Sequence, residues 1–232
     1  MPQLGLGSSL SRGGVLSGFE NTYSLEFDGT GDYIRFTEQT YSGSFTISLW
    51  VKGDFQHSVT SNYDEITAGS NSSVIRTTDV AGRAEIRVAG SSAGTISGIS
   101  ADTWTHLVWV RNSSNVFTTY RDNNSSSGNT VSGDFKIRDL GGEGGVDYWT
   151  GLLDEVAVWD AELDAANVAA IYNSGTPIAL DKDSGNYDKS GDLQGWWRME
   201  EGSGSTVADS SGNDLEATLN GDPTFSTDVP PS

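Results

Sequence analysis

Apolar and polar side chains alternate along most of this chain, and a period of two residues predicts β-strands. The alternating stretches are short and are separated by Gly, Asn, Asp and Ser, which favour turns. The predicted strands are 23–28, 32–37, 44–52, 64–68, 72–77, 83–89, 94–99, 104–111, 115–121, 134–138 and 150–159. In the last of these, apolar residues occupy both parities, so we expect both of its faces to be covered.

One segment departs from the alternation and predicts a single short helix over 164–173. Apolar side chains recur at helical spacing between Val168 and Tyr172. Asp164 can accept hydrogen bonds from the free N–H groups of the first turn. Gly175 suits the left-handed position that ends many helices. The pattern therefore predicts an all-β chain with one helix near its C-terminal end.

The segments between and after these elements are polar or glycine-rich. Residues 122–129 read as an exposed polar turn and 141–145 as a flexible loop. Residues 193–225 carry two tryptophans but are too few for an independent core, so we expect them to return to the same sandwich. The alternative is the opening of a second domain. Residues 226–232 are expected to be a tail.

Charge and composition exclude several classes of protein. The 232 residues include 32 acidic and 13 basic ones, which gives a formal net charge of −19. This balance argues against nucleic-acid binding, which needs clustered Lys and Arg, and it leaves carboxylates available for a divalent cation. The absence of cysteine excludes disulfides and thiolate metal sites. No apolar run of about 18 residues is present, so no membrane insertion is expected.

The first 20 residues form a segment of a different kind. Leu4, Leu6 and Leu10 are set among Gly and Ser. A flexible tail is one interpretation. The other, which we favour, is an arm whose leucines dock into a neighbouring subunit. The segment lacks the basic region and apolar core of a signal peptide. A protein assembled inside a cell and displayed on a virion satisfies these observations.

Five segments together resemble a known family. They are Ser24–Phe36 (SLEFDGTGDYIRF), Phe45–Lys52 (FTISLWVK), Trp104–Val110 (WTHLVWV), Gly151–Trp159 (GLLDEVAVW), and Leu193–Glu200 (LQGWWRME) with Asp209–Asn213 (DSSGN). They resemble laminin-G-like domains of the concanavalin A-like lectin/glucanase superfamily, of the kind found in phage structural proteins. The resemblance covers roughly residues 21–225 and implies a two-sheet antiparallel jelly roll. The tryptophan-rich segment opens many such domains, whereas here it follows the predicted helix.

A structural calcium ion is one expectation for the predicted sandwich. The turn from Asp28 to Asp32 offers two carboxylates and flexible carbonyls within five residues, and Ca²⁺ prefers such oxygens. Some relatives hold calcium near an acidic residue of the last long strand, and Asp154 occupies a comparable place. The predicted ligands are therefore Asp28, Asp32 and Asp154. Ordinary turn chemistry is the alternative for the Asp-Gly pairs.

Catalysis is not expected. Relatives that hydrolyse glycosides carry Glu-x-Asp-x-x-Glu on one strand, and this chain has no such spacing. Asp154 and Glu155 are adjacent, so they point to opposite faces of a strand. The two histidines, His57 and His106, have no nucleophile motif beside them, and His106 is expected to be packed.

The favoured function is that of a non-enzymatic virion structural protein, such as a capsid decoration, fibre or tail-associated subunit on the virion exterior. Its partners would be other virion subunits or further copies of itself. The alternative is an extracellular carbohydrate-binding module that recognises cell-surface glycans. Aromatic platforms for sugar rings would then come from Tyr63, Tyr120, Tyr148 and Trp149, unless these residues belong to the core.

Overall fold

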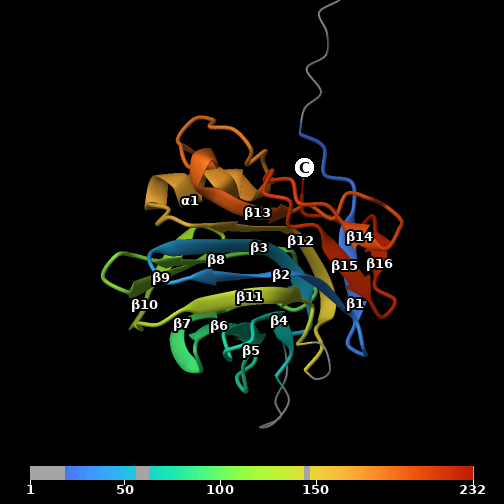
Figure 1. Cartoon of the computed structure of the whole chain (residues 1–232), viewed down its shortest axis with the longest axis horizontal. Coiled ribbons are helices and arrows are strands. Elements are labelled where there is room, and N and C mark those ends of the chain that lie inside the picture. The colour runs from blue at the N-terminus through green and yellow to red at the C-terminus, as the bar shows by residue number, and fades with distance from the viewer. Residues whose placement is uncertain (1–18, 56–62, 144–146, 232) are drawn as a thin grey trace, which may run out of the picture.

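The computed structural model describes residues 19–55, 63–143 and 147–231, which form two antiparallel sheets packed face to face (Figure 1). The strands are β1 Ser24–Asp28, β2 Tyr33–Tyr41, β3 Phe45–Gly53, β4 Glu65–Ala68, β5 Val74–Thr77, β6 Arg83–Val88, β7 Ser91–Ser97, β8 Thr105–Arg111, β9 Val116–Arg121, β10 Asn124–Thr130, β11 Phe135–Leu140, β12 Thr150–Trp159, β13 Leu193–Trp197, β14 Thr206–Val207, β15 Ala217–Asn220 and β16 Thr224–Ser226. The predicted all-β, two-sheet sandwich is confirmed.

Each sheet has eight strands among the described residues. The first sheet runs in the order β10-β9-β8-β3-β12-β1-β16, with β13 also paired to β12. The second runs in the order β14-β15-β2-β11-β4-β5-β6-β7. The main core lies between the two sheets. Phe45 of β3 stacks on Phe135 of β11 with ring centroids 4.8 Å apart, so aromatic contacts join the two layers directly.

A cap covers the outer face of the first sheet. It consists of helix α1, Ala165–Tyr172, and the loop after it, which includes the short 3-10 turns Asn173–Gly175 and Ser190–Asp192 (Figure 1). This cap forms a second apolar cluster with the outward side chains of β8, β9 and β12. Trp159 of β12 donates from its indole to the Tyr187 hydroxyl at 3.0 Å. The expectation that β12 is covered on both faces is correct for this reason.

The helix begins and ends as predicted. Asp164 is the N-cap, and its Oδ1 accepts the Asn167 backbone N–H at 2.8 Å. Gly175 has the expected positive φ of 102°, and the C-cap Asn173 is also left-handed, with φ 44°. Asparagine tolerates this region because its short polar side chain can bond locally, and its amide donates to the Thr176 carbonyl at 3.2 Å. None of the described helices has the length and apolar character of a membrane span.

The C-terminal segment contributes strands to both sheets. β13 pairs with the second half of β12, along the edge whose first half pairs with β1. β15 pairs with β2, and β16 pairs with β1. Residues 226–231, expected to be a tail, make specific contacts although Thr227, Asp228 and Pro231 are exposed. The Asp228 carboxylate accepts from the Trp104 indole at 2.8 Å and pairs with Lys52.

One predicted turn is in fact a strand. Residues 122–129 were expected to be an exposed polar turn, but Asn124–Thr130 form β10 at the edge of the first sheet. Most of its side chains are exposed and all are polar or glycine, so no apolar alternation marked it as a strand. The register of β10 shifts between Ser127 and Thr130, and such an irregularity at an edge discourages pairing with another chain.

Candidate functional site

Among the described residues, the outer face of the second sheet has no cap like that of the first sheet, and this face is polar. Direct cross-strand pairing places Glu65 of β4, Arg76 of β5, Glu85 of β6 and Thr95 of β7 in one row. The inward parity of the same strands carries core residues such as Ile75 and Ile86. Because strand side chains alternate between faces, the row points away from the core. We call these four residues the charged row.

Ion pairs hold the centre of the charged row. Glu85 Oε1 accepts from Arg76 Nε at 3.0 Å, from Arg76 Nη2 at 2.9 Å and from Arg87 Nη1 at 3.1 Å. The Arg76 guanidinium also lies 3.8 Å from the centroid of the Tyr63 ring. Burial acts to raise the pKa of Glu85, but hydrogen bonds from Ser92 and the two arginines outweigh it and hold that pKa below its usual value.

An open pocket of about 270 Å³ lies over this network. Its lining includes Tyr63, Thr78 and Thr95 together with the side chains of Arg76, Arg83, Asp79, Glu85 and Arg87. It therefore combines an aromatic ring, hydroxyls, guanidinium donors and carboxylate acceptors. This is the mixture of groups that fixes a polar ligand in a binding site.

Glu65, at the end of the charged row, has an unusual environment. It is 6% exposed, and its Oε2 has no hydrogen-bond partner among the described residues. Burial raises the pKa of Glu65 to about 7, with further repulsion from Glu143 and Asp147 and partial compensation from Arg76. Glu65 does not line the pocket, so its carboxyl group is not placed to touch a ligand there.

A second ion-pair group lies further along the same face. Arg35 of β2 forms a fork with the buried Asp139 of β11, at 2.6 Å from Nε to Oδ1 and 2.8 Å from Nη2 to Oδ2. Arg138 donates to the same carboxylate at 3.2 Å. A two-bond fork is the strongest geometry for an arginine–carboxylate pair, so it orders this part of the face.

The predicted aromatic platforms fall into two groups. Tyr120 and Trp149 are core residues, 7% and 0% exposed, so the platform interpretation is wrong for them. Tyr63 and Tyr148 are half-buried. Tyr63 borders the pocket, while the backbone of Tyr148 forms a bridge with Glu65. The sequence alone did not distinguish these groups because all four residues lie in or beside predicted strands.

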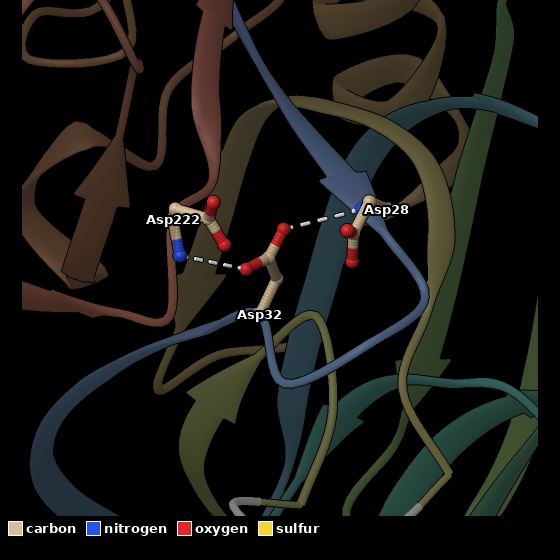
Figure 2. Close-up of side chains that lie close together, drawn as sticks. All are labelled: Asp28, Asp32 and Asp222. Carbon is tan, nitrogen blue, oxygen red and sulfur yellow. Dashed lines mark hydrogen bonds between the residues drawn. The ribbon is translucent and has the colours of Figure 1, made fainter.

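The predicted calcium ligands Asp28 and Asp32 do lie together, and Asp222 joins them (Figure 2). One carboxylate oxygen from each residue lies within 4.8 Å of the others. The buried Asp32 accepts the Asp28 backbone N–H at 3.2 Å and the Asp222 backbone N–H at 2.8 Å. A Cβ atom on Gly221 would approach Asp32 Oδ1 to 2.4 Å, so only glycine allows this close turn.

The third predicted ligand, Asp154, lies elsewhere. It is fully buried in β12, opposite Trp50 of β3, and its Oδ2 accepts from the Asn21 side-chain amide at 2.9 Å. Asp154 Oδ1 and Asn21 Oδ1 are both buried, and neither accepts a hydrogen bond from a residue that the structure describes. Burial raises the pKa of Asp154 well above its usual value, and the adjacent Glu155 adds repulsion. Asp154 therefore does not belong to the Asp28–Asp32–Asp222 cluster.

Calcium binding stays a prediction, and the donor set of the acidic cluster fits it. Three carboxylates converge at the cluster, and Ca²⁺ takes about six to eight oxygens, several of them from carboxylates and waters. Asp222 would be a ligand that the sequence did not suggest, because it is 190 residues from Asp32. Its one visible signal is a Gly-Asp pair like that of the Asp28 turn.

Calcium is expected to stabilise the wild type by about 2.7 kcal/mol when its concentration is a hundred times Kd. The melting temperature should therefore be higher in calcium than in EDTA. Asp222→Asn, at an exposed position, should abolish this difference, whereas Asp154→Asn should keep it. Calorimetric titration of CaCl₂ into each variant provides the check. If Asp154→Asn abolished the calcium effect and Asp222→Asn kept it, the ion would bind at Asp154. An equal melting temperature of the wild type in calcium and in EDTA would contradict the prediction.

The remaining predicted residues have clear outcomes. His106 is 1% exposed, as expected for a packed residue, and its Nε2 lies 2.7 Å from Ser48 Oγ. Burial lowers the pKa of His106 to about 3. Leu4, Leu6, Leu10 and His57 lie outside the described residues.

Sequence reasoning missed the charged row. Arg76 and Glu85 have the outward parity of two predicted strands, so alternation alone was sufficient to place them on a solvent face. Their pairing was not visible, because it depends on which strands are neighbours.

Comparisons with known proteins agree with this architecture. Residues 28–169 match a laminin G-type family described as the concanavalin A-like lectin/glucanases superfamily. A search of curated proteins finds no significant match. Among solved structures, a "putative carbohydrate binding protein" from Bacteroides ovatus ATCC 8483 has a TM-score of 0.67 at 14% identity, over 92% of this chain and 62% of that one. A heptameric SAP-like pentraxin from Limulus polyphemus has a TM-score of 0.57 at 17% identity, over 86% of this chain and 95% of that one.

These low identities show the shared fold alone, while the family match covers more than half of the chain. It includes β12 and the start of α1, together with the strands that build the charged row. The chain belongs to the concanavalin A-like lectin/glucanases superfamily.

Proposed function

We propose that this protein is a carbohydrate-binding module and that it binds saccharide on the outer face of its second sheet. The observation that carries the proposal is the contrast between the two broad faces. The cap covers the outer face of the first sheet, whereas on the second sheet no described element closes the pocket of about 270 Å³ beside the charged row. Sugar hydroxyls are recognised by such fixed donors and acceptors beside an aromatic ring.

The similarity to known proteins supports the same proposal. The Bacteroides ovatus protein, which has the higher TM-score of the two structures compared, is described as a "putative carbohydrate binding protein", and this chain spans only 62% of its length. An extracellular location accompanies the proposal, since polysaccharides and surface glycans are found there. The virion role and the docking arm stay predictions, because Leu4, Leu6 and Leu10 lie outside the described residues.

We propose binding without hydrolysis. Glycoside hydrolysis needs two carboxyl groups that flank the scissile bond, with room for the sugar between them. Glu65 and Glu85 have pKa values displaced in opposite directions, which is typical of such a pair. However, Arg76 is placed between them by the strand pairing, bonds Glu85 and packs on Tyr63. A saccharide in the pocket would therefore not lie between Glu65 and Glu85. The other carboxylate of the lining is Asp79, and the Glu85 carboxylate is already held in ion pairs by Arg76 and Arg87.

The proposal is tested by replacing Thr95, an exposed residue of β7 that lines the pocket, with tryptophan. On a panel of plant, bacterial and animal polysaccharides, the wild type should bind at least one class without releasing reducing ends. Thr95→Trp should weaken that binding at least tenfold, because the larger side chain fills the pocket.

Thr224→Trp is the matched control, since Thr224 is an exposed strand residue at the other end of the sandwich. Its affinity should equal that of the wild type. If Thr95→Trp and the wild type had equal affinity for the saccharide, the binding site would lie outside this pocket. A folded wild type that binds no saccharide would overturn the proposal.

A further inference from the structure

The pocket over the charged row differs in charge from the rest of the molecule. The whole chain has a formal net charge of −19, with 13 basic residues against 32 acidic ones. The pocket lining nevertheless contains three arginines and two carboxylates, Glu85 and Asp79, so it has an excess of one positive charge. A cationic site on a strongly acidic protein is a local feature and does not follow from composition.

Glu85 does not neutralise the arginines that it contacts. A single oxygen, Oε1, accepts from both Arg76 and Arg87, so two guanidinium groups share one carboxylate. Each guanidinium has five N–H donors, and the bonds to Glu85 use two of those on Arg76 and one on Arg87. Arg87 also donates to the Gly90 carbonyl. Donors therefore remain for a ligand.

Arg83 supplies the unpaired charge. It is exposed at the start of β6, two residues before Glu85 on the same face of the strand. No carboxylate among the described residues pairs with it, while Arg76 and Arg87 both have Glu85 as a partner. An exposed arginine that lines a pocket without a partner keeps its full capacity for a two-bond contact with an anion.

Arg76 is held in a fixed position before any ligand binds. Its guanidinium is fixed by two bonds to Glu85 and by stacking 3.8 Å from the Tyr63 centroid. Its side chain is only 19% exposed, so little rotamer freedom remains to be lost on binding. Thr78 and Thr95 add hydroxyls to the same lining, which suits the hydroxyls of a sugar ring beside an anionic group.

We propose that this pocket selects an acidic saccharide and binds its carboxylate or sulfate group through Arg83 and the free N–H groups of Arg76 and Arg87. The inference rests on the proposed carbohydrate-binding function and adds the charge class of the ligand. Because the chain as a whole repels polyanions, attraction to an anionic saccharide has to come from this site and not from general surface charge.

The test compares ligands that differ only in charge. Calorimetric titrations at low ionic strength use oligogalacturonate against its methyl ester, and dextran sulfate against dextran of equal length. We expect at least tenfold tighter binding of one charged ligand than of its neutral counterpart, and weaker binding as salt is added. A preference within the first pair identifies a carboxylate ligand, and a preference within the second identifies a sulfate ligand.

Arg83→Gln should lower the affinity for the charged ligand about tenfold. It should change the affinity for the neutral ligand little. Arg83 is exposed and has no carboxylate partner within residues 19–55, 63–143 and 147–231, so its replacement is not expected to disturb folding. Lys182→Gln is the matched control, because it removes one exposed positive charge from the loop of the cap, over the opposite face. This variant should bind like the wild type.

Three results would overturn the inference. Equal affinity for charged and neutral ligands, with binding still lost in Thr95→Trp, would leave carbohydrate binding intact and remove the selection for charge. If Lys182→Gln and Arg83→Gln lost the same affinity for the charged ligand, the attraction would come from the overall charge of the protein and not from this pocket. No binding of any saccharide by the folded wild type would remove the proposed function as well.

Discussion

Replacing Trp197 with alanine is expected to lower the free energy of unfolding by about 3–5 kcal/mol, the range typical of large-to-small aromatic changes in a core. Trp197 is 1% exposed in β13, and its ring centroid lies 4.1 Å from that of Phe36 in the opposite sheet. Its indole also donates to the Leu215 carbonyl at 2.8 Å. The substitution would remove a large contact between the sheets and leave that carbonyl without its donor.

Chemical denaturation of Trp197→Ala and of the wild type checks this expectation. Gln194→Ala is a suitable control, because Gln194 is only half-buried on the same strand and should change stability by less than about 1 kcal/mol. Trp197→Phe should fall between the two, since it retains packing against Phe36 and loses the indole bond. A loss below about 1 kcal/mol in Trp197→Ala would mean that the C-terminal strands are dispensable for the sandwich.

The stability of the wild type is expected to fall as the pH rises from about 4.5 to about 7 because of Glu65. Its pKa is raised from a usual value near 4.5 to about 7, so the native state binds this proton more strongly than the unfolded chain. The stabilisation is complete below the unfolded pKa and is lost as the pH rises through the folded one. The difference amounts to about 3 kcal/mol.

Denaturation midpoints of Glu65→Gln and the wild type, measured between pH 4 and pH 8, isolate this contribution. The variant should lose less stability across that window, because glutamine has no proton to release. Part of the decrease in stability with rising pH should persist in the variant, since burial also raises the pKa of Glu155 to about 8. Glu38→Gln is the control, because hydrogen bonds from Ser70 outweigh burial and lower the pKa of Glu38, so its effect lies at lower pH. Identical slopes in Glu65→Gln and the wild type would refute the assignment.

Much of the fold was predictable from local pattern. The strand at 150–159 and the helix after it follow from periodicities of 2 and 3.6 residues, which depend only on neighbours along the chain. One clear failure has a local cause: β10 has no apolar alternation because it is an exposed edge strand.

The candidate sites were less predictable. Asp28 and Asp32 were found together because one short turn holds them, but Asp222 reaches them from the far end of the chain. The charged row depends in the same way on the order β4-β5-β6-β7. Tyr120 and Trp149 were candidates for platforms only because a sequence pattern does not distinguish an aromatic core residue from an exposed one.

The sequence by itself determined most of the strands up to residue 159, the helix, the net negative charge and the absence of cysteine chemistry, since these depend on residue type and local spacing. The tertiary structure decided which face is open. The cap closes the first sheet through contacts such as Trp159 with Tyr187, whereas among the described residues the outer face of the second sheet has no such cap and the pocket beside the charged row is open. Strand order and register bring distant residues together, and the free energy that selects them comes from burying the whole core, which no local pattern contains.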